Sequence, residues 1–202
     1  MKEETTVLHK CISKDELNEL PLQHFDGEIQ LVETLEQVDE AVRFLEHQLI
    51  LGFDTETRPS FKKGQVNPVA LLQLSTGDKA FLFRINKIGL PESLVRILAD
   101  PRIVKSGAAI RDDIKILKNV THFRPGGFVE LQEYVKDFGI ENFSLKKLAG
   151  IVLGFRISKS QRLTNWESPV LTPPQQIYAA TDAWVSYEIY VRLMELEGQI
   201  AI

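Results

Sequence analysis

Hydrophobic and polar positions follow two patterns along the chain. Short apolar runs typical of strands alternate with helical spacing in the first half, and helical spacing dominates afterwards. The pattern predicts strands over residues 28–32, 49–56, 69–74, 79–84 and 103–105. It predicts helices over residues 34–45, 90–99, 109–117, 131–138, 144–153 and 173–197. The sequence therefore predicts a single α/β domain in which helices flank a mixed central sheet.

Capping and turn residues support these boundaries. Thr34 with Gln37, and Thr172 with Gln175, have the spacing of capping boxes that begin helices. The turn sequence at residues 75–78 separates two apolar runs, which predicts a hairpin.

The first 27 residues are more polar and lack a regular period. We expect residues 1–27 to form an extension of unknown role, with a short helix near residues 14–20, and residues 28–202 to form the functional domain. No apolar run approaches the roughly 18 residues of a membrane span, and the start is too polar for a signal peptide. An intracellular, cytoplasmic protein without a membrane partner is the expectation. Cys11 stands alone and excludes an internal disulfide.

Charge is distributed unevenly. The net charge of −4 weakly disfavours a nucleic-acid partner, because lysine and arginine provide most phosphate affinity. Two windows without acids, residues 57–77 and 142–166, nevertheless contain clustered cations. These cations are Arg58, Lys62 and Lys63 in the first window and Lys146, Lys147, Arg156, Lys159 and Arg162 in the second. Each window alone could be an ordinary solvated face.

The sequence GFDTET places Asp54 and Glu56 at the end of an apolar strand. Alternate residues of a strand point to the same side, so the two carboxylates face one way. Like charges this close must be protonated, solvated or neutralised by a cation. A solvated strand end is the alternative interpretation of this short motif.

Two later helices contribute acids to the same hypothesis. Asp113 lies beside the apolar stripe of its helix, although stabilisation of a helix start is an alternative role for it. Tyr178 and Asp182 are one turn apart in a helix that looks largely buried, where a carboxylate needs a partner. A half-buried tyrosine and an exposed aspartate are the alternative there.

The candidate acids Asp54, Glu56, Asp113 and Asp182 offer hard oxygen ligands suited to Mg²⁺ or Mn²⁺. The histidines are scattered without ligand spacing, and one cysteine cannot form a zinc cluster of cysteines. The sequence therefore predicts a divalent-cation site built from carboxylates.

Three motifs in order, FDTET, KSGAAIRDDIKIL and YAATDAW, resemble those of DEDD-type 3′-to-5′ exonucleases. The approach SKSQRLTNWESPVLTPPQQIYAATDAW is more similar to the Werner-syndrome exonuclease branch than to the ribonuclease D branch. Tyr178 identifies the tyrosine subclass, since Ile177 occupies the position of the histidine in the other subclass. The resemblance covers about residues 28–196.

The resemblance implies a ribonuclease H-like fold and two divalent ions, Mg²⁺ or Mn²⁺. Asp54, Glu56 and Asp182 would surround the first ion, with Asp54 also reaching the second and Asp113 supporting it. Tyr178 would orient or help deprotonate the attacking water, and we expect chiefly the orienting role, because its reference pKa of about 10 makes it a poor base.

The same resemblance implies substrate contacts. Gln73 and Leu74 would lie near the terminal nucleotide. Four further candidates precede the last helix, namely Lys159, Arg162, Asn165 and Trp166. The two cations could bind phosphates, and Trp166 could stack on a base or could simply pack beneath a loop.

The resemblance implies that the partner is the 3′ end of a nucleic acid and that the reaction releases nucleoside monophosphates. DNA is favoured over RNA on the likeness to the Werner branch alone. The alternative is a catalytically silent nucleic-acid-binding or interaction module on the same fold. Protein partners are not predicted.

Overall fold

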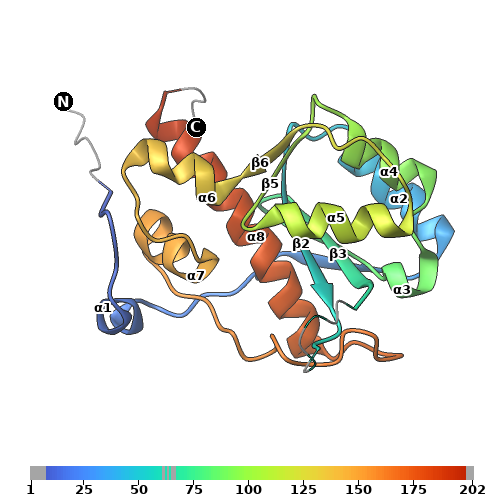
Figure 1. Ribbon diagram of the computed structural model, residues 1–202, viewed down its shortest axis with the longest axis horizontal. Helices are drawn as coiled ribbons and strands as arrows, with labels where there is room; N and C mark the ends of the chain where they lie inside the picture. The colour runs from blue at the N-terminus through green and yellow to red at the C-terminus, as the bar shows by residue number, and fades with distance from the viewer. Residues whose placement is uncertain (1–7, 61, 63, 65–66, 199–202) are drawn as a thin grey trace.

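The computed structural model describes residues 8–60, 62, 64 and 67–198. Its centre is a six-stranded sheet in the order β1-β4-β3-β2-β5-β6 (Figure 1). The strands are β1 (Glu28–Val32), β2 (Ile50–Thr57), β3 (Val69–Ser75), β4 (Lys79–Phe83), β5 (Val104–Gly107) and β6 (Phe128–Glu130). Strand β2 runs antiparallel to β3 and parallel to β5. The predicted mixed sheet in an α/β domain is confirmed.

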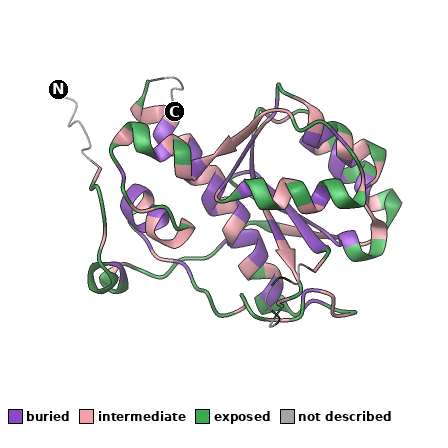
Figure 2. Ribbon diagram, viewed as in Figure 1, coloured by how far each residue is buried: buried purple, intermediate pink, exposed green. Residues whose placement is uncertain are grey.

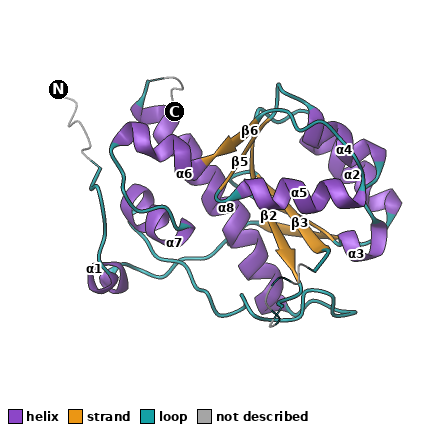
Figure 3. Ribbon diagram, in the orientation of Figure 1, coloured by secondary structure: helices purple, strands orange, loops and turns teal. Residues whose placement is uncertain are grey.

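Helices cover both faces of this sheet (Figure 3). They are α1 (Lys14–Glu19), α2 (Leu35–Leu45), α3 (Ile85–Ile88), α4 (Glu92–Ala99), α5 (Ile110–Val120), α6 (Leu131–Tyr134), α7 (Leu145–Leu148) and α8 (Pro173–Leu196). On one face, Leu72 and Leu74 of β3 belong to a core shared with α2, α4 and α5. On the other face, Leu71 packs with Ala179 and Ala180 of α8. The alternation along β3 thus serves two hydrophobic layers.

Helix α8 approaches β2 unusually closely. A Cβ atom at Gly52 would collide with the backbone carbonyl of Ala183, so glycine is required at this point of the strand. The helix residue at this contact, Ala183, is itself small and buried. The consequence is that side chains at the end of β2 meet side chains of α8 directly.

Most predicted elements occur within a few residues of their expected bounds, and the capping boxes at Thr34 and Thr172 both form. Strand β6 and helix α3 were not predicted. The predicted helix over residues 144–153 is α7 followed by a π-helical stretch, Ala149–Leu153. None of the described helices is long and apolar enough to cross a membrane.

The segment before β1 lies against the domain. Leu17 of α1 and Phe25 are buried, and Figure 2 shows α1 with both buried and exposed stretches. Leu22 pairs with Arg156 in a parallel bridge, and the Phe25 amide donates to the Thr181 hydroxyl at 3.0 Å. These contacts connect the segment to α8 and to the residues that follow Gly154. The division of the chain into residues 1–27 and 28–202 stays a prediction.

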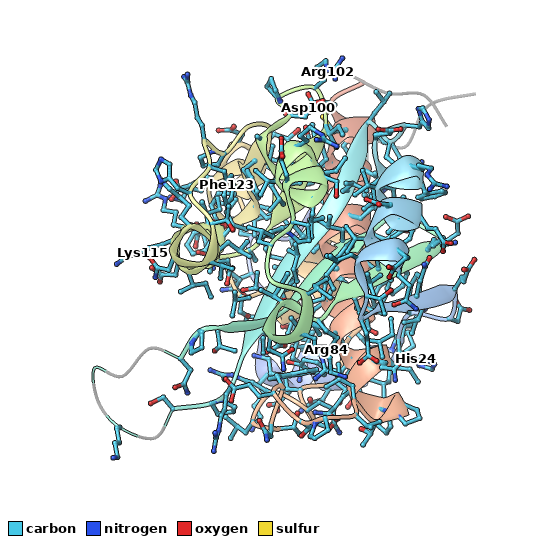
Figure 4. The ribbon with its side chains drawn as sticks, turned by 90° about the vertical axis from the view of Figure 1, so that its right-hand side faces the viewer. His24, Arg84, Asp100, Arg102, Lys115 and Phe123 are labelled. Carbon is cyan, nitrogen blue, oxygen red and sulfur yellow. The ribbon has the colours of Figure 1, made fainter. Side chains whose placement is uncertain are left out.

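A buried arginine fixes the loop that leads into α8. Arg84 has no exposed surface, and Figure 4 shows it below the sheet near this loop. Its guanidinium donates to Glu33 at 3.1 Å and to the Ser168 carbonyl at 2.5 Å. Lys87 donates to the Pro169 carbonyl at 2.8 Å and so holds the adjacent residue.

Candidate active site

The end of β2 distributes its side chains between two helices. Asp54 lies opposite Gln73 of β3, on the face covered by α8, and Glu56 follows on that face. Thr55 points to the other face, where its hydroxyl donates to the Asp113 carboxylate of α5 at 2.5 Å. Strand β2 therefore places Asp54 and Glu56 against α8 and contacts Asp113 of α5 through the Thr55 hydroxyl.

Three of the predicted acids converge. Carboxylate oxygens of Asp54, Glu56 and Asp182 all lie within 4.8 Å of one another. Asp113 does not belong to this trio, but it is close enough to raise the pKa of Asp54 and Glu56 electrostatically. The structure thus brings all four sequence-predicted acids to one place, with Asp113 at its edge.

Burial and mutual repulsion hold protons on these acids. Burial, followed by repulsion from Asp182 and then Glu56, raises the pKa of Asp54 well above its ordinary value. Burial and the Asp182 charge raise the pKa of Glu56 to about 9. Burial raises the pKa of Asp182 to about 7 and that of Asp113 to about 6. A cation bound beside these carboxylates would stabilise their ionised forms.

Tyr178 lies one helical turn before Asp182 and faces the same cluster. Burial raises the pKa of its hydroxyl, and the charges of Asp182, Glu56 and Asp54 raise it further. The phenol therefore stays protonated at neutral pH and can donate a hydrogen bond, which fits the predicted orienting role.

The cluster opens into a cavity of about 280 Å³ that is lined by residues of α6, α7 and α8 and by the residues just before α5. Lys159 and Arg162 line it, and their charges lower the pKa of Asp182 and Glu56 respectively. Lys146, from the same basic window, also lines the cavity. Of the first window, Lys63 lies outside the described residues. The structure therefore combines acids that attract cations with cations that attract phosphate.

The entry to α5 contains residues that the sequence analysis missed. Ala109 has a left-handed backbone with φ of 63°, a strained conformation for a residue with a Cβ atom. The Glu130 carboxylate of β6 accepts hydrogen bonds from the amides of Ala109 and Ile110 at 2.8 and 2.9 Å. Glu130 therefore caps the helix that carries Asp113, and no local pattern signals a cap 20 residues away in sequence.

The structure places several predicted substrate contacts away from the cavity surface. The side chains of Gln73, Leu74 and Trp166 are buried and do not line the cavity, so their contact with a nucleotide stays a prediction. Trp166 packs beneath a loop near Tyr178, with ring centroids 6.0 Å apart, which is the alternative interpretation of this residue. Asn165 is exposed but does not line the cavity, and its side chain accepts a hydrogen bond from the Glu167 amide.

The acidic cluster fits a divalent cation. Its donors are carboxylate oxygens, the ligands preferred by Mg²⁺ and Mn²⁺, and their oxygens are close enough to share one ion. Their raised pKa values show that opposite charge would be strongly favoured there.

A mixed sheet with carboxylates on its central strand and on α8, and with cations on the same cavity, fits an enzyme that acts on phosphate esters with divalent cations. The chain belongs to the 3′-5′ exonuclease family, because the sequence model of this family matches residues 29–196. It is 33% identical over 201 residues to the mouse bifunctional 3′-5′ exonuclease/ATP-dependent helicase WRN, covering 92% of this chain and 14% of that protein. It is 33% identical over 162 residues to human exonuclease 3′-5′ domain-containing protein 2, covering 74% and 26% respectively.

Solved structures share the fold. The Nibbler EXO domain of Aedes aegypti superposes with a TM-score of 0.77 at 22% identity, covering 89% of this chain and 94% of that one. Escherichia coli RNase D superposes with a TM-score of 0.77 at 24% identity, covering 85% and 46%. The expected ribonuclease H-like exonuclease architecture is confirmed.

Proposed function

We propose that this 3′-5′ exonuclease releases nucleoside monophosphates from the 3′ end of a nucleic acid with the help of two divalent cations. Asp54, Glu56 and Asp182 would hold one ion, and Asp54 with Asp113 the other. The observation that carries the proposal is the convergence of three carboxylates within 4.8 Å in a cavity that also contains lysine and arginine. Bound there, Mg²⁺ or Mn²⁺ would acidify the attacking water and neutralise charge on the leaving oxygen.

The protein's own groups position the reactants. Lys159 and Arg162 are exposed at the cavity and would bind the substrate phosphates as cations. Tyr178 would donate a hydrogen bond that orients the attacking water, because its raised pKa keeps its proton in place. Neutralising both Lys159 and Arg162 should weaken binding and flatten its salt dependence.

We favour DNA over RNA as the substrate. The likeness to the Werner exonuclease branch led to this choice, and a relative named DNA polymerase I, from Aquifex aeolicus, supports it at 25% identity over 166 residues. The RNase D neighbours share the fold and make RNA the alternative. The chain spans 14 to 42% of the length of its first curated relatives, so the activities of those whole proteins are not transferred.

The test follows DNA and RNA strands of one sequence, labelled at the 5′ end, in Mg²⁺, Mn²⁺ or chelator. We expect a ladder that shortens from the 3′ end, faster for DNA than for RNA, and no cleavage in chelator. The Asp54→Asn variant should lose more than about 100-fold in rate, since even partners of metal ligands cost roughly 10- to 100-fold.

Asp112→Asn is the matched control, because Asp112 is an exposed acid next to Asp113 that lies outside the cavity. It should retain nearly full activity. Strands that are bound but never shortened would reject the nuclease proposal, and faster hydrolysis of RNA would reject the DNA preference.

A further inference from the structure

A row of cations follows the outer face of α5. Arg111, Lys115 and Lys118 are four and three residues apart and all exposed. At about 100° per residue, their side chains fall within roughly 60° of one another around the helix. The exposed acid Asp112 lies about 100° from Arg111, outside this sector. We call Arg111, Lys115 and Lys118 the α5 basic row.

The basic row lines a hollow of about 430 Å³, together with Ile114, Asn119 and His122. Within the described part of the chain, none of its three cations forms an ion pair. Glu133 forms an ion pair with Lys136 at 2.6 Å, which lowers the pKa of its carboxyl group, and the charge of Arg111 adds only a smaller effect. In a chain of net charge −4, three unpaired cations on one concave surface form a distinct positive site.

The row begins at the candidate active site and leads away from it. Asp113 lies in the first turn of α5, and Ala109, just before the helix, lines the catalytic cavity. Figure 1 shows α5 running from beside α8 across the front of the sheet, and Figure 2 shows exposed stretches along it. In Figure 4, Lys115 projects from this helix into solvent. The 11 residues of α5 extend about 16 Å.

We infer that the α5 basic row binds the phosphodiester backbone of the substrate on the 5′ side of the scissile bond. This inference rests on the proposed function, because it extends the same substrate strand out of the catalytic cavity. Continuity with that cavity favours a nucleic acid over an acidic protein. The three cations are spread over about 10 Å of helix, and each can neutralise one backbone phosphate of the strand.

A requirement for length follows from this geometry. With its 3′ end in the catalytic cavity, a trinucleotide is too short to cover the whole row, whereas a strand of about 20 nucleotides is long enough. The row should therefore contribute to binding only for the longer substrate, and its contribution should be electrostatic and weakened by salt.

The experiment compares the unsubstituted protein with the Arg111→Gln/Lys115→Gln/Lys118→Gln variant. Binding of both substrates is measured in chelator over a range of salt, and hydrolysis is measured with Mg²⁺. For the longer strand we expect roughly 10- to 100-fold weaker binding and a salt slope smaller by about 2, since each neutralised phosphate contributes about 0.7. Trinucleotide hydrolysis should be unchanged.

The control is Lys14→Gln/Arg43→Gln/Arg96→Gln, which removes the same charge from exposed positions on α1, α2 and α4. It should bind the longer strand nearly as well as the unsubstituted protein. An unchanged salt slope in the α5 variant, equal losses on both substrates, or tighter binding of polyglutamate than of the strand would overturn the inference. Each of these results leaves hydrolysis by the unsubstituted protein intact, whereas absence of all hydrolysis would overturn the proposed function.

Discussion

Tyr178 shows how a single side chain is defined by its charged neighbours. Its hydroxyl faces the carboxylates of Asp182, Glu56 and Asp54, and burial and their charges raise its pKa. A phenol in this environment cannot act as a base at neutral pH, because the phenolate would add a further negative charge to the cluster. What it can do is donate one directed hydrogen bond.

This assignment predicts the effect of Tyr178→Phe. We expect kcat to fall roughly 10- to 100-fold with KM nearly unchanged, less than the 10²- to 10⁴-fold typical for loss of an acid or base. Steady-state kinetics on a labelled strand measures both constants. Tyr187→Phe, a partly buried tyrosine of the same helix outside the cavity, is the control. Full activity of Tyr178→Phe would remove the orienting role.

The candidate site residues differ in whether local sequence determines their position. Asp54 and Glu56 could be located from the sequence because a two-residue period fixes the face that they share. Trp166 could not, because its burial depends on the loop that Arg84 and Lys87 anchor from the far edge of the sheet. The resemblance to a family predicted that Gln73 lies near the terminal nucleotide, but it did not predict that Gln73 is buried on the sheet face that α8 covers.

At the scale of elements, the strained start of α5 is stabilised by its neighbour β6. Glu130 accepts from two amides at this start, and Asp113 lies in the turn that follows. An acid at a helix N-terminus is favourable both as a hydrogen-bond acceptor and through the helix dipole. The position of Asp113 therefore depends on a strand of only three residues.

We expect Glu130→Ala to reduce kcat about 10-fold or more and to lower the free energy of unfolding by about 1 kcal/mol, as loss of a cap does. The Mg²⁺ concentration for half-maximal activity should rise, which loss of stability alone would not cause. Glu133→Ala is the control, because this exposed acid of α6 bonds only Lys136 among the described residues. Equal Mg²⁺ requirements for both variants would contradict the positioning role.

Long elements were predictable and short ones were not. The 24 residues of α8 have a capping box that marks their start, and β3 is a continuous apolar run. Strand β6 has three residues and helix α3 has four, too few to display a period. The entry to α5 depends on a contact between residues 109 and 130, which local spacing cannot encode.

At the scale of the whole molecule, the acidic cluster opposes folding when no cation is bound. Its carboxyl groups have raised pKa values, about 9 for Glu56 and about 7 for Asp182, so the folded chain retains protons that the unfolded chain releases. Stability contributed by such groups is present at low pH and is lost as pH rises from about 4 through the folded pKa values. Ionising the carboxylates that would bind the cation therefore lowers the free energy of unfolding at neutral pH.

Removing one charge should reduce this destabilisation. In chelator near pH 8, we expect Asp54→Asn to unfold at least about 2 °C higher than the unsubstituted protein, and near pH 5 the difference should shrink. Lys105, buried with its pKa lowered to about 8, contributes with the opposite sign, but it is common to both proteins and cancels in the comparison. Saturating Mg²⁺ should reverse the order, because only the intact cluster gains the full binding free energy. The measurement is the thermal unfolding temperature of both proteins at the two pH values. An Asp54→Asn variant that unfolds at a lower temperature than the unsubstituted protein, in chelator near pH 8, would show that repulsion among the carboxylates does not destabilise the fold.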